Sequence, residues 1–186
     1  MRWFILFPMS FVVTLIVMLF APVIVLFSDA DGKLPSWLVW AGTLDNPLDG
    51  DSGFQSEHAP FLGAQTGWRR YINRVFWLWR NPAYGFDIRV CGATLVPGDA
   101  VGYWGTLNTS DQGTPGCFIG WCDGYWDFYL VWRYSTNYCF RFRAGWKLQT
   151  FAQAPGQLTA PTRAQINLRI MPMAAFTPLT PDTTPA

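Results

Sequence analysis

Residues 3–27 read WFILFPMSFVVTLIVMLFAPVIVLF and contain no charged side chain. Ser10 and Thr14 are the only polar side chains among them. As a helix this stretch would be about 37 Å long at ~1.5 Å per residue, which is enough to cross a hydrocarbon core of about 30 Å with some tilt. Pro8 and Pro22 do not exclude a span, because neighbouring groups can satisfy the carbonyl that a proline leaves free. The stretch predicts a membrane protein with a single transmembrane anchor at 1–28.

The length of the apolar stretch bears on whether it is removed. A secretory signal has an apolar core of about 7–15 residues, so the longer stretch here favours an uncleaved anchor. Cleavage after Ser28-Asp29-Ala30 is the alternative that the sequence leaves open.

Charges beside the span bear on its orientation. Arg2 precedes it, whereas Asp29 and Asp31 follow it. The positive-inside rule then favours a cytoplasmic N-terminus and an outward, periplasmic domain. The basic cluster at 69–74 would argue for the opposite orientation if it lay near the membrane.

The composition limits the classes of partner that the protein could bind. Lys and Arg total 13 against 12 Asp and Glu, so there is no global positive field to attract nucleic acid. Aromatic residues make up 18% of the chain and include 11 Trp. Such rings favour sites that are apolar at one end and wet at the other. Both a membrane interface and a ring-filled β core fit this composition, and no cofactor is implied.

Residues 29–65 are predicted to form an interfacial, turn-rich linker. Trp37 and Trp40 are three residues apart, so a turn or short helix would place both indoles at headgroup level. The carboxylates of Asp45, Asp49 and Asp51 are a weak candidate for a cation site. A solvated turn is the favoured interpretation, because a proline and a glycine stand where a calcium loop needs oxygen ligands.

Residues 66–81 predict a basic, aromatic amphipathic helix with Thr66 as a possible N-cap. Its arginines lie off the apolar stripe. The helix would either lie on an anionic membrane or pack on its own domain with the arginines in solvent. The candidate membrane-interface or partner-binding residues are Trp37, Trp40, Trp68, Arg69, Arg70, Arg74, Trp77, Trp79 and Arg80.

The segment after this helix predicts a break and then strands. We expect Asn81, Pro82, Tyr84 and Phe86 to form a junction whose rings pack on an aromatic hairpin. The strand-like runs are 86–95, 102–107, 116–123, 125–134, 138–144 and 165–170. The sequence thus predicts an α+β fold, with a mostly antiparallel β domain and the amphipathic helix at 66–171, and a disordered Pro/Thr tail at 172–186.

Alternation within 138–144 predicts two unlike faces on that strand. Tyr138, Phe140 and Phe142 share one face, and the intervening positions, which include two arginines, share the other.

Four cysteines allow disulfides or buried free thiols. Cys117 with Cys122 across a tight hairpin is the first candidate pair. Catalytic motifs are scarce: His58 is the only histidine, and no serine elbow, P-loop or dinucleotide fingerprint occurs.

Three sequence pieces resemble an uncharacterised family of small membrane proteins encoded by tailed bacteriophages and prophages. They are the apolar N-terminus running into LPSWLVWAGTLDNPLDGD, the segment WLWRNPAYGF, and the later RFRAGWKL. The resemblance spans residues 20–150 and implies a phage origin and a host inner-membrane address. It implies no catalytic residues.

The leading expectation is a single-pass membrane protein that binds lipid and a host or phage membrane protein. Envelope modification, exclusion of a second phage, or support of lysis or assembly would be its task. The alternative is a minor virion structural protein, and a membrane-anchored hydrolase comes third.

Overall fold

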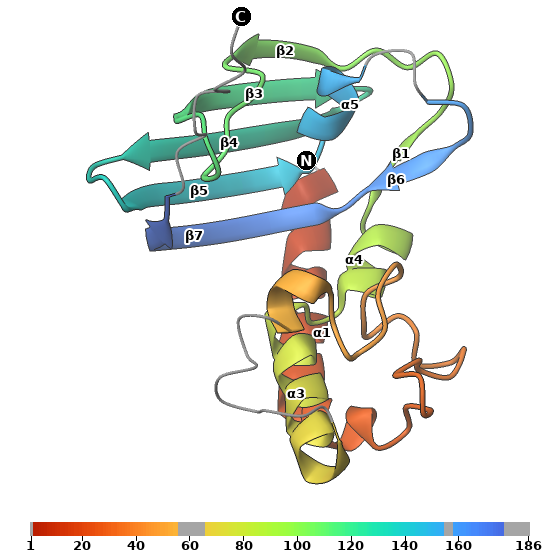
Figure 1. Cartoon of the computed structure of the whole chain (residues 1–186). Coiled ribbons are helices and arrows are strands. Elements are labelled where there is room, and N and C mark those ends of the chain that lie inside the picture. Colours follow the sequence, from red (N-terminus) through yellow and green to blue (C-terminus); the bar gives the residue numbers. More distant parts are fainter. Residues whose placement is uncertain (1, 56–65, 155–157, 177–186) are drawn as a thin grey trace, which may run out of the picture. The chain divides into compact units, whose positions relative to one another are not determined.

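The protein is described by a computed structural model covering residues 2–55, 66–154 and 158–176. It divides into two compact units, Met1–Cys91 and Gly92–Ala186. The first unit is helical and the second carries a mostly antiparallel sheet (Figure 1), so the predicted α+β class is confirmed. The boundary differs from the expected one, because the amphipathic helix belongs to the same unit as the N-terminal helix.

The first unit contains α1 (Arg2–Val25), α3 (Gly67–Arg80) and α4 (Tyr84–Arg89). Helix α1 passes through both prolines and ends three residues after Pro22. Helices α1 and α3 lie side by side (Figure 1). Thr66 stands at the N-cap of α3 as expected, but its side chain makes no capping hydrogen bond.

The segment between α1 and α3 is more than a linker. Its turns put Leu38, Ala41, Leu48 and Phe54 into the core of the first unit. The predicted turns are therefore present, and they direct apolar side chains of this segment against α1 and α3.

The predicted strand at 86–95 is wrong over most of its length, because α4 occupies its first part. Ala83 has φ 54° and reverses the chain after Pro82. The amides of Ala83, Gly85 and Phe86 then donate to carbonyls at 40–42. A Cβ on Gly85 would lie 2.7 Å from the Val39 carbonyl oxygen, so glycine is required at this approach.

The junction motif therefore joins two helices and not a helix and a strand. The Phe86 ring meets Trp40 edge-on at 6.5 Å within the first unit, in place of the hairpin partner expected for it.

The second unit is built on a five-stranded antiparallel sheet in the order β2-β3-β4-β5-β7. Its strands are β2 (Gly102–Gly105), β3 (Gly116–Cys122), β4 (Tyr125–Arg133), β5 (Tyr138–Trp146) and β7 (Ile166–Ala175). A second small sheet pairs β1 (Ala93–Leu95) with β6 (Thr162–Ala164), and α5 (Gln149–Gln153) follows β5.

The predicted strands at 116–123, 125–134 and 138–144 are confirmed, and those at 102–107 and 165–170 are confirmed with shifted ends. The tail is shorter than expected because β7 continues through Pro172 to Ala175. Pro172 is tolerated because β7 is an edge strand of the sheet. Residues 177–186 lie outside the described part of the chain.

The two faces of this sheet differ sharply. The covered face holds Asp127, Tyr129, Arg141 and Arg143, and lies under α5 and the loop at 106–115. The opposite face, here named the ring face, has no charged side chain on its strands. The cross-strand register places on it Trp104, Ile119, Trp121, Trp126, Phe128, Leu130, Trp132, Phe140, Phe142, Leu168 and Ile170.

Candidate membrane-facing site

One side of α1 faces the rest of its unit. The covered and half-covered positions include 3, 7, 10, 14, 17, 21 and 24, which are separated alternately by four and three residues. This spacing is that of a helix packed along a partner. Ser10 and Thr14, the only polar residues of the apolar stretch, both lie on this packed side. Helix α1 therefore keeps its polar groups against protein.

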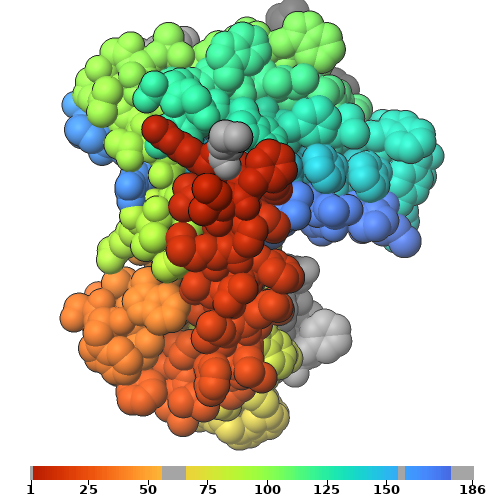
Figure 2. Space-filling model, turned by 180° about the vertical axis from the view of Figure 1, so that it is seen from behind, coloured from red at the N-terminus to blue at the C-terminus, as the bar shows by residue number. Residues whose placement is uncertain are grey.

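From residue 3 onward, the other side of α1 is exposed and apolar. Figure 2 shows α1, in red, at the surface of its unit. The helix is long and apolar enough to cross a membrane by length and composition. Exposed apolar patches of a few hundred Å² are already large for a soluble monomer. The exposed set, here named the apolar arc, is Phe4, Ile5, Phe11, Val12, Leu15, Ile16, Met18, Leu19, Phe20 and Val23.

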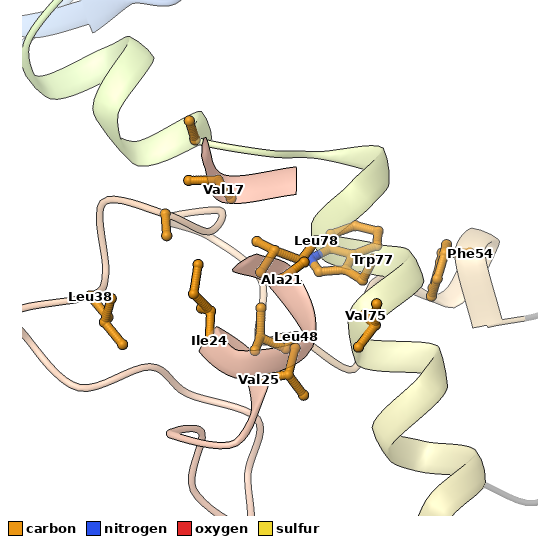
Figure 3. Packing of buried hydrophobic residues seen from close by; sticks show 12 residues of the cluster. Val17, Ala21, Ile24, Val25, Leu38, Leu48, Phe54, Val75, Trp77 and Leu78 are labelled. Atoms are coloured by element: carbon orange, nitrogen blue, oxygen red, sulfur yellow. The ribbon is translucent and has the colours of Figure 1, made fainter. Parts of the chain in front are cut away.

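The packed side joins a core that α3 and the loop at 34–54 share. Figure 3 shows Val17, Ala21 and Ile24 of α1 among residues that include Trp77 and Leu78 of α3. Trp77 is only 3% exposed and meets Phe54 edge-on at 5.0 Å. Trp77 was expected at an interface with lipid or a partner, but it is a core residue.

Helix α3 also satisfies backbone groups that Pro22 leaves free. Pro22 has no N–H to donate to the Met18 carbonyl four residues earlier. The Trp79 indole N–H donates to that carbonyl at 2.8 Å. The Tyr71 hydroxyl donates to the carbonyl of Pro22 itself, also at 2.8 Å. Two aromatic residues of α3 thus complete the hydrogen bonding of a proline-containing α1.

An ionic cluster fastens the C-terminal end of α1 to α3. Asp49 accepts hydrogen bonds from Arg70 at 2.9 Å and from Arg74 at 2.7 Å. Arg74 also donates to the Ser28 hydroxyl and to the carbonyls of Asp29 and Ala30. Burial raises the pKa of Asp49, but the two guanidinium groups outweigh it and lower that pKa from 3.8 to about 2. Asp49 is therefore a structural anion.

This cluster corrects two expectations. Arg74 is buried and Arg70 is bound, so neither faces solvent or lipid freely. The helical period had placed Arg74 on the polar side. That side is covered because Asp49 and the end of α1 supply partners for it.

The other arginines of the predicted interface stay at the surface. Arg69 lies over the exposed Trp68 ring, 5.9 Å from its centroid. Arg80 lies over Phe54 at 5.7 Å. Trp37 is exposed and meets Phe27 edge-on, whereas Trp40 is half-buried and donates to the Trp37 carbonyl. These placements leave Trp37, Trp68 and Trp79 as the exposed indoles of the first unit's described residues.

A buried carboxyl lies against the middle of α1. The Ser10 hydroxyl donates to Asp87 of α4 at 2.6 Å. The thiol of Cys91 reaches the Leu6 carbonyl at 3.8 Å. Burial, followed by the charge of Asp87, raises the pKa of Cys91 to about 11, so this thiol stays protonated.

The candidate cation site is taken up by protein contacts. Asp49 is held by two arginines, and Asp51 caps the Phe54 amide at 2.7 Å. In the described residues no three His, Cys, Asp or Glu side chains gather at one place. His58 and Glu57 lie outside the described residues.

The predicted Cys117–Cys122 disulfide is wrong. Both residues belong to β3 and point to opposite faces, about 17 Å apart at ~3.4 Å per residue. None of the four cysteines forms a disulfide, and burial raises the pKa of the Cys117, Cys122 and Cys139 thiols.

Sequence reasoning missed the ring face as a surface. Alternation correctly separated Phe140 and Phe142 from the arginines of β5. The aromatic side of this alternation favours a core face, because aromatic rings usually point inward. The overlooked signal is that Asp127 and Tyr129 of β4 share the arginine side, where their charges and hydroxyl find partners.

Comparison with known proteins places the first unit and most of the second in one family. A family model described as a family of unknown function, DUF7338, matches residues 1–177. The chain belongs to this family. The match includes α1. No curated protein and no solved structure matches the chain.

Proposed function

We propose that the chain is a membrane-anchored binding protein of phage or prophage origin that acts at the host inner membrane. The observation that carries the proposal is the apolar arc of α1, which is exposed while both polar residues of that helix face protein. A water-exposed helix would reverse this arrangement. The phage origin rests on the motif resemblance alone.

Retention of α1 is supported by its place in the core. Cleavage after Ala30 would remove Val17, Ala21, Ile24 and Val25 from the packing in Figure 3. It would also remove the acceptors that hold Arg74 at residues 28–30. A helix that its own unit depends on is an anchor and not a disposable signal.

The described surface supports binding in place of catalysis. The apolar arc and the ring face are aromatic and apolar, and the carboxylates of Asp49 and Asp127 are held in structural ion pairs. The N-terminus is proposed to be cytoplasmic, following the charges that flank α1.

Fractionation of phage-producing bacteria tests this function. We expect the natural chain in the inner membrane, and cross-linking there should capture a membrane protein together with it. Recovery chiefly in purified virions would overturn the proposal in favour of a structural component. Recovery in the cytosol would overturn the anchor itself.

A further inference from the structure

The ring face of the sheet is built against the usual rule for an antiparallel sheet. Such a sheet normally packs one apolar face on its core and turns a polar face to water. Here Asp127 and Arg143 are on the covered face and the other face has no charge. Its rings are nevertheless open: Trp132 is 65% exposed, and Trp104 and Ile170 are similar. Contact with water is therefore unfavourable for the ring face, and we expect another apolar surface to cover it.

We propose that the ring face lies on the bilayer surface, with its indoles at headgroup level. This inference rests on the proposed anchoring by α1. It adds a second region of lipid contact in the other unit, where none was expected from the sequence.

Tryptophan content is the first argument for lipid. Four of the five tryptophans of the second unit lie on the ring face, namely Trp104, Trp121, Trp126 and Trp132, whereas Trp146 is buried. Tryptophan is enriched where a surface meets both hydrocarbon and water. Ile170 and Leu168 on the edge strand β7 extend the same apolar surface.

The area of the ring face is the second argument. Five strands spaced ~4.8 Å apart, which are four to ten residues long at ~3.4 Å per residue, give a planar face of about 600 Å². A standard protein interface buries about 800 Å² on each partner. The face is thus small for a stable contact between two copies. Contact with lipid does not need this area, because α1 already holds the chain at the membrane. Binding of the ring face to lipid is then effectively an intramolecular step.

The absence of charge on the ring face is the third argument. A face without Lys or Arg gains nothing from anionic lipid, so its attachment should not depend on salt or on lipid charge. Attachment should therefore occur on zwitterionic phosphatidylcholine alone.

Spin labels on the full-length chain in phosphatidylcholine vesicles test the proposal. Labels would be placed singly through Trp132→Cys and Ile170→Cys on the ring face. Thr150→Cys, an exposed position of α5 over the covered face, is the matched control. Leu19→Cys on the apolar arc reports on the anchor. The native thiols are buried or half-buried, so the engineered thiol reacts first.

We expect labels at 132 and 170 to collide with oxygen in preference to a water-soluble nickel chelate, as the label at 19 does. The ratio should reverse at 150. Spectral broadening that unlabelled protein dilutes away would mean that a second copy covers the face, and would overturn the proposal. Preference for nickel at 132 and 170, or exclusion of both agents without broadening, would overturn it as well. Preference for nickel at 19 would instead remove the proposed anchor, and the inference with it.

Discussion

Arg74 shows how one side chain joins three parts of the first unit. Arg74 donates to the Asp49 carboxylate in the loop, and it also donates to the carbonyls of Asp29 and Ala30 just after the end of α1. A buried guanidinium of this kind is stable only while its counter-charge is present.

The first prediction removes that counter-charge. Asp49→Asn should destabilise the protein by about 3 kcal/mol, because Arg74 would be left buried without a carboxylate. Thermal unfolding in detergent, followed by tryptophan fluorescence, measures the loss. Asp31→Asn is the control, since Asp31 is exposed and makes no hydrogen bond to Arg74 among those described. Equal stability of the two variants would contradict the structural role of Asp49.

The same carboxyl predicts a pH dependence. Its pKa is lowered from 3.8 to about 2 in the folded protein. A lowered carboxyl pKa contributes stability that is complete above about pH 4 and is lost as the pH falls toward 2. The natural protein should therefore lose stability across this range more steeply than Asp49→Asn. Parallel acid profiles of the two proteins would refute the assignment.

Pro22 and Trp79 give a second test at the residue scale. Trp79→Phe removes the donor to the Met18 carbonyl and should cost about 1–2 kcal/mol. In a Pro22→Ala background the amide of residue 22 can donate to that carbonyl, so the cost of Trp79→Phe should shrink by about 1 kcal/mol. A double-mutant cycle in detergent measures this coupling. If the free-energy changes of the two substitutions simply add, the Trp79 indole does not replace the hydrogen bond that Pro22 cannot donate.

Side-chain roles were the least predictable level. The spacing of Arg69, Arg70 and Arg74 indicated a basic side of a helix, but not that Asp49, 25 residues from Arg74, would neutralise it. Such a partner is fixed by tertiary packing, which no local period encodes. The favoured interpretation of Asp49 as part of a solvated turn is wrong for the same reason.

At the scale of elements, α5 is held to the sheet through one carboxylate. Asp127 on β4 is fully buried and accepts from Arg143 and from the amides of Leu148 and Gln149. It therefore joins two neighbouring strands to the start of α5. Asp127 thus ties the covered face to the helix that lies over it.

The third prediction concerns this connection. Asp127→Asn should destabilise the second unit by about 3–5 kcal/mol, because an amide cannot neutralise Arg143. Hydrogen exchange at β4 and β5 should rise, while exchange at α3 stays as in the natural chain. Asp123→Asn, an exposed change in the next turn, should alter stability by less than about 0.5 kcal/mol. Unchanged exchange at β4 and β5 in Asp127→Asn would argue against the connection.

Elements with strong local patterns were predictable, and α4 was not. Helix α1 is an unbroken apolar run, α3 carries a helical period, and strands β3, β4 and β5 lie in runs rich in strand-forming residues. The run after Pro82 is rich in aromatic and β-branched residues and so resembles a strand. Its helical turn is imposed by Ala83 in a left-handed conformation and by hydrogen bonds to the carbonyls at 40–42. Those contacts cross more than forty residues of sequence.

At the scale of the whole molecule, the chain presents two unlike apolar surfaces, the arc of α1 and the ring face of the sheet. Both leave large side chains exposed while charged groups are buried in pairs. Membrane insertion of α1 is the central claim, because the retention of the helix, the inner-membrane address and the lipid contact of the ring face all depend on it.

The fourth prediction addresses that claim by changing the arc alone. Leu15 and Leu19 are exposed and take no part in the packed side of α1. Replacing both by arginine should cost about 5–7 kcal/mol of insertion free energy, at ~2.5–3.5 kcal/mol for each central arginine. Leu15→Ala with Leu19→Ala is the matched control, which keeps the arc apolar and should leave insertion intact.

Alkaline carbonate extraction of bacterial membranes that contain these chains is the most direct measurement. The account predicts that the natural chain and the double alanine variant remain in the membrane pellet, while the double arginine variant is released. Release of the natural chain, or retention of the double arginine variant in the same proportion as the natural chain, would contradict insertion through the apolar arc.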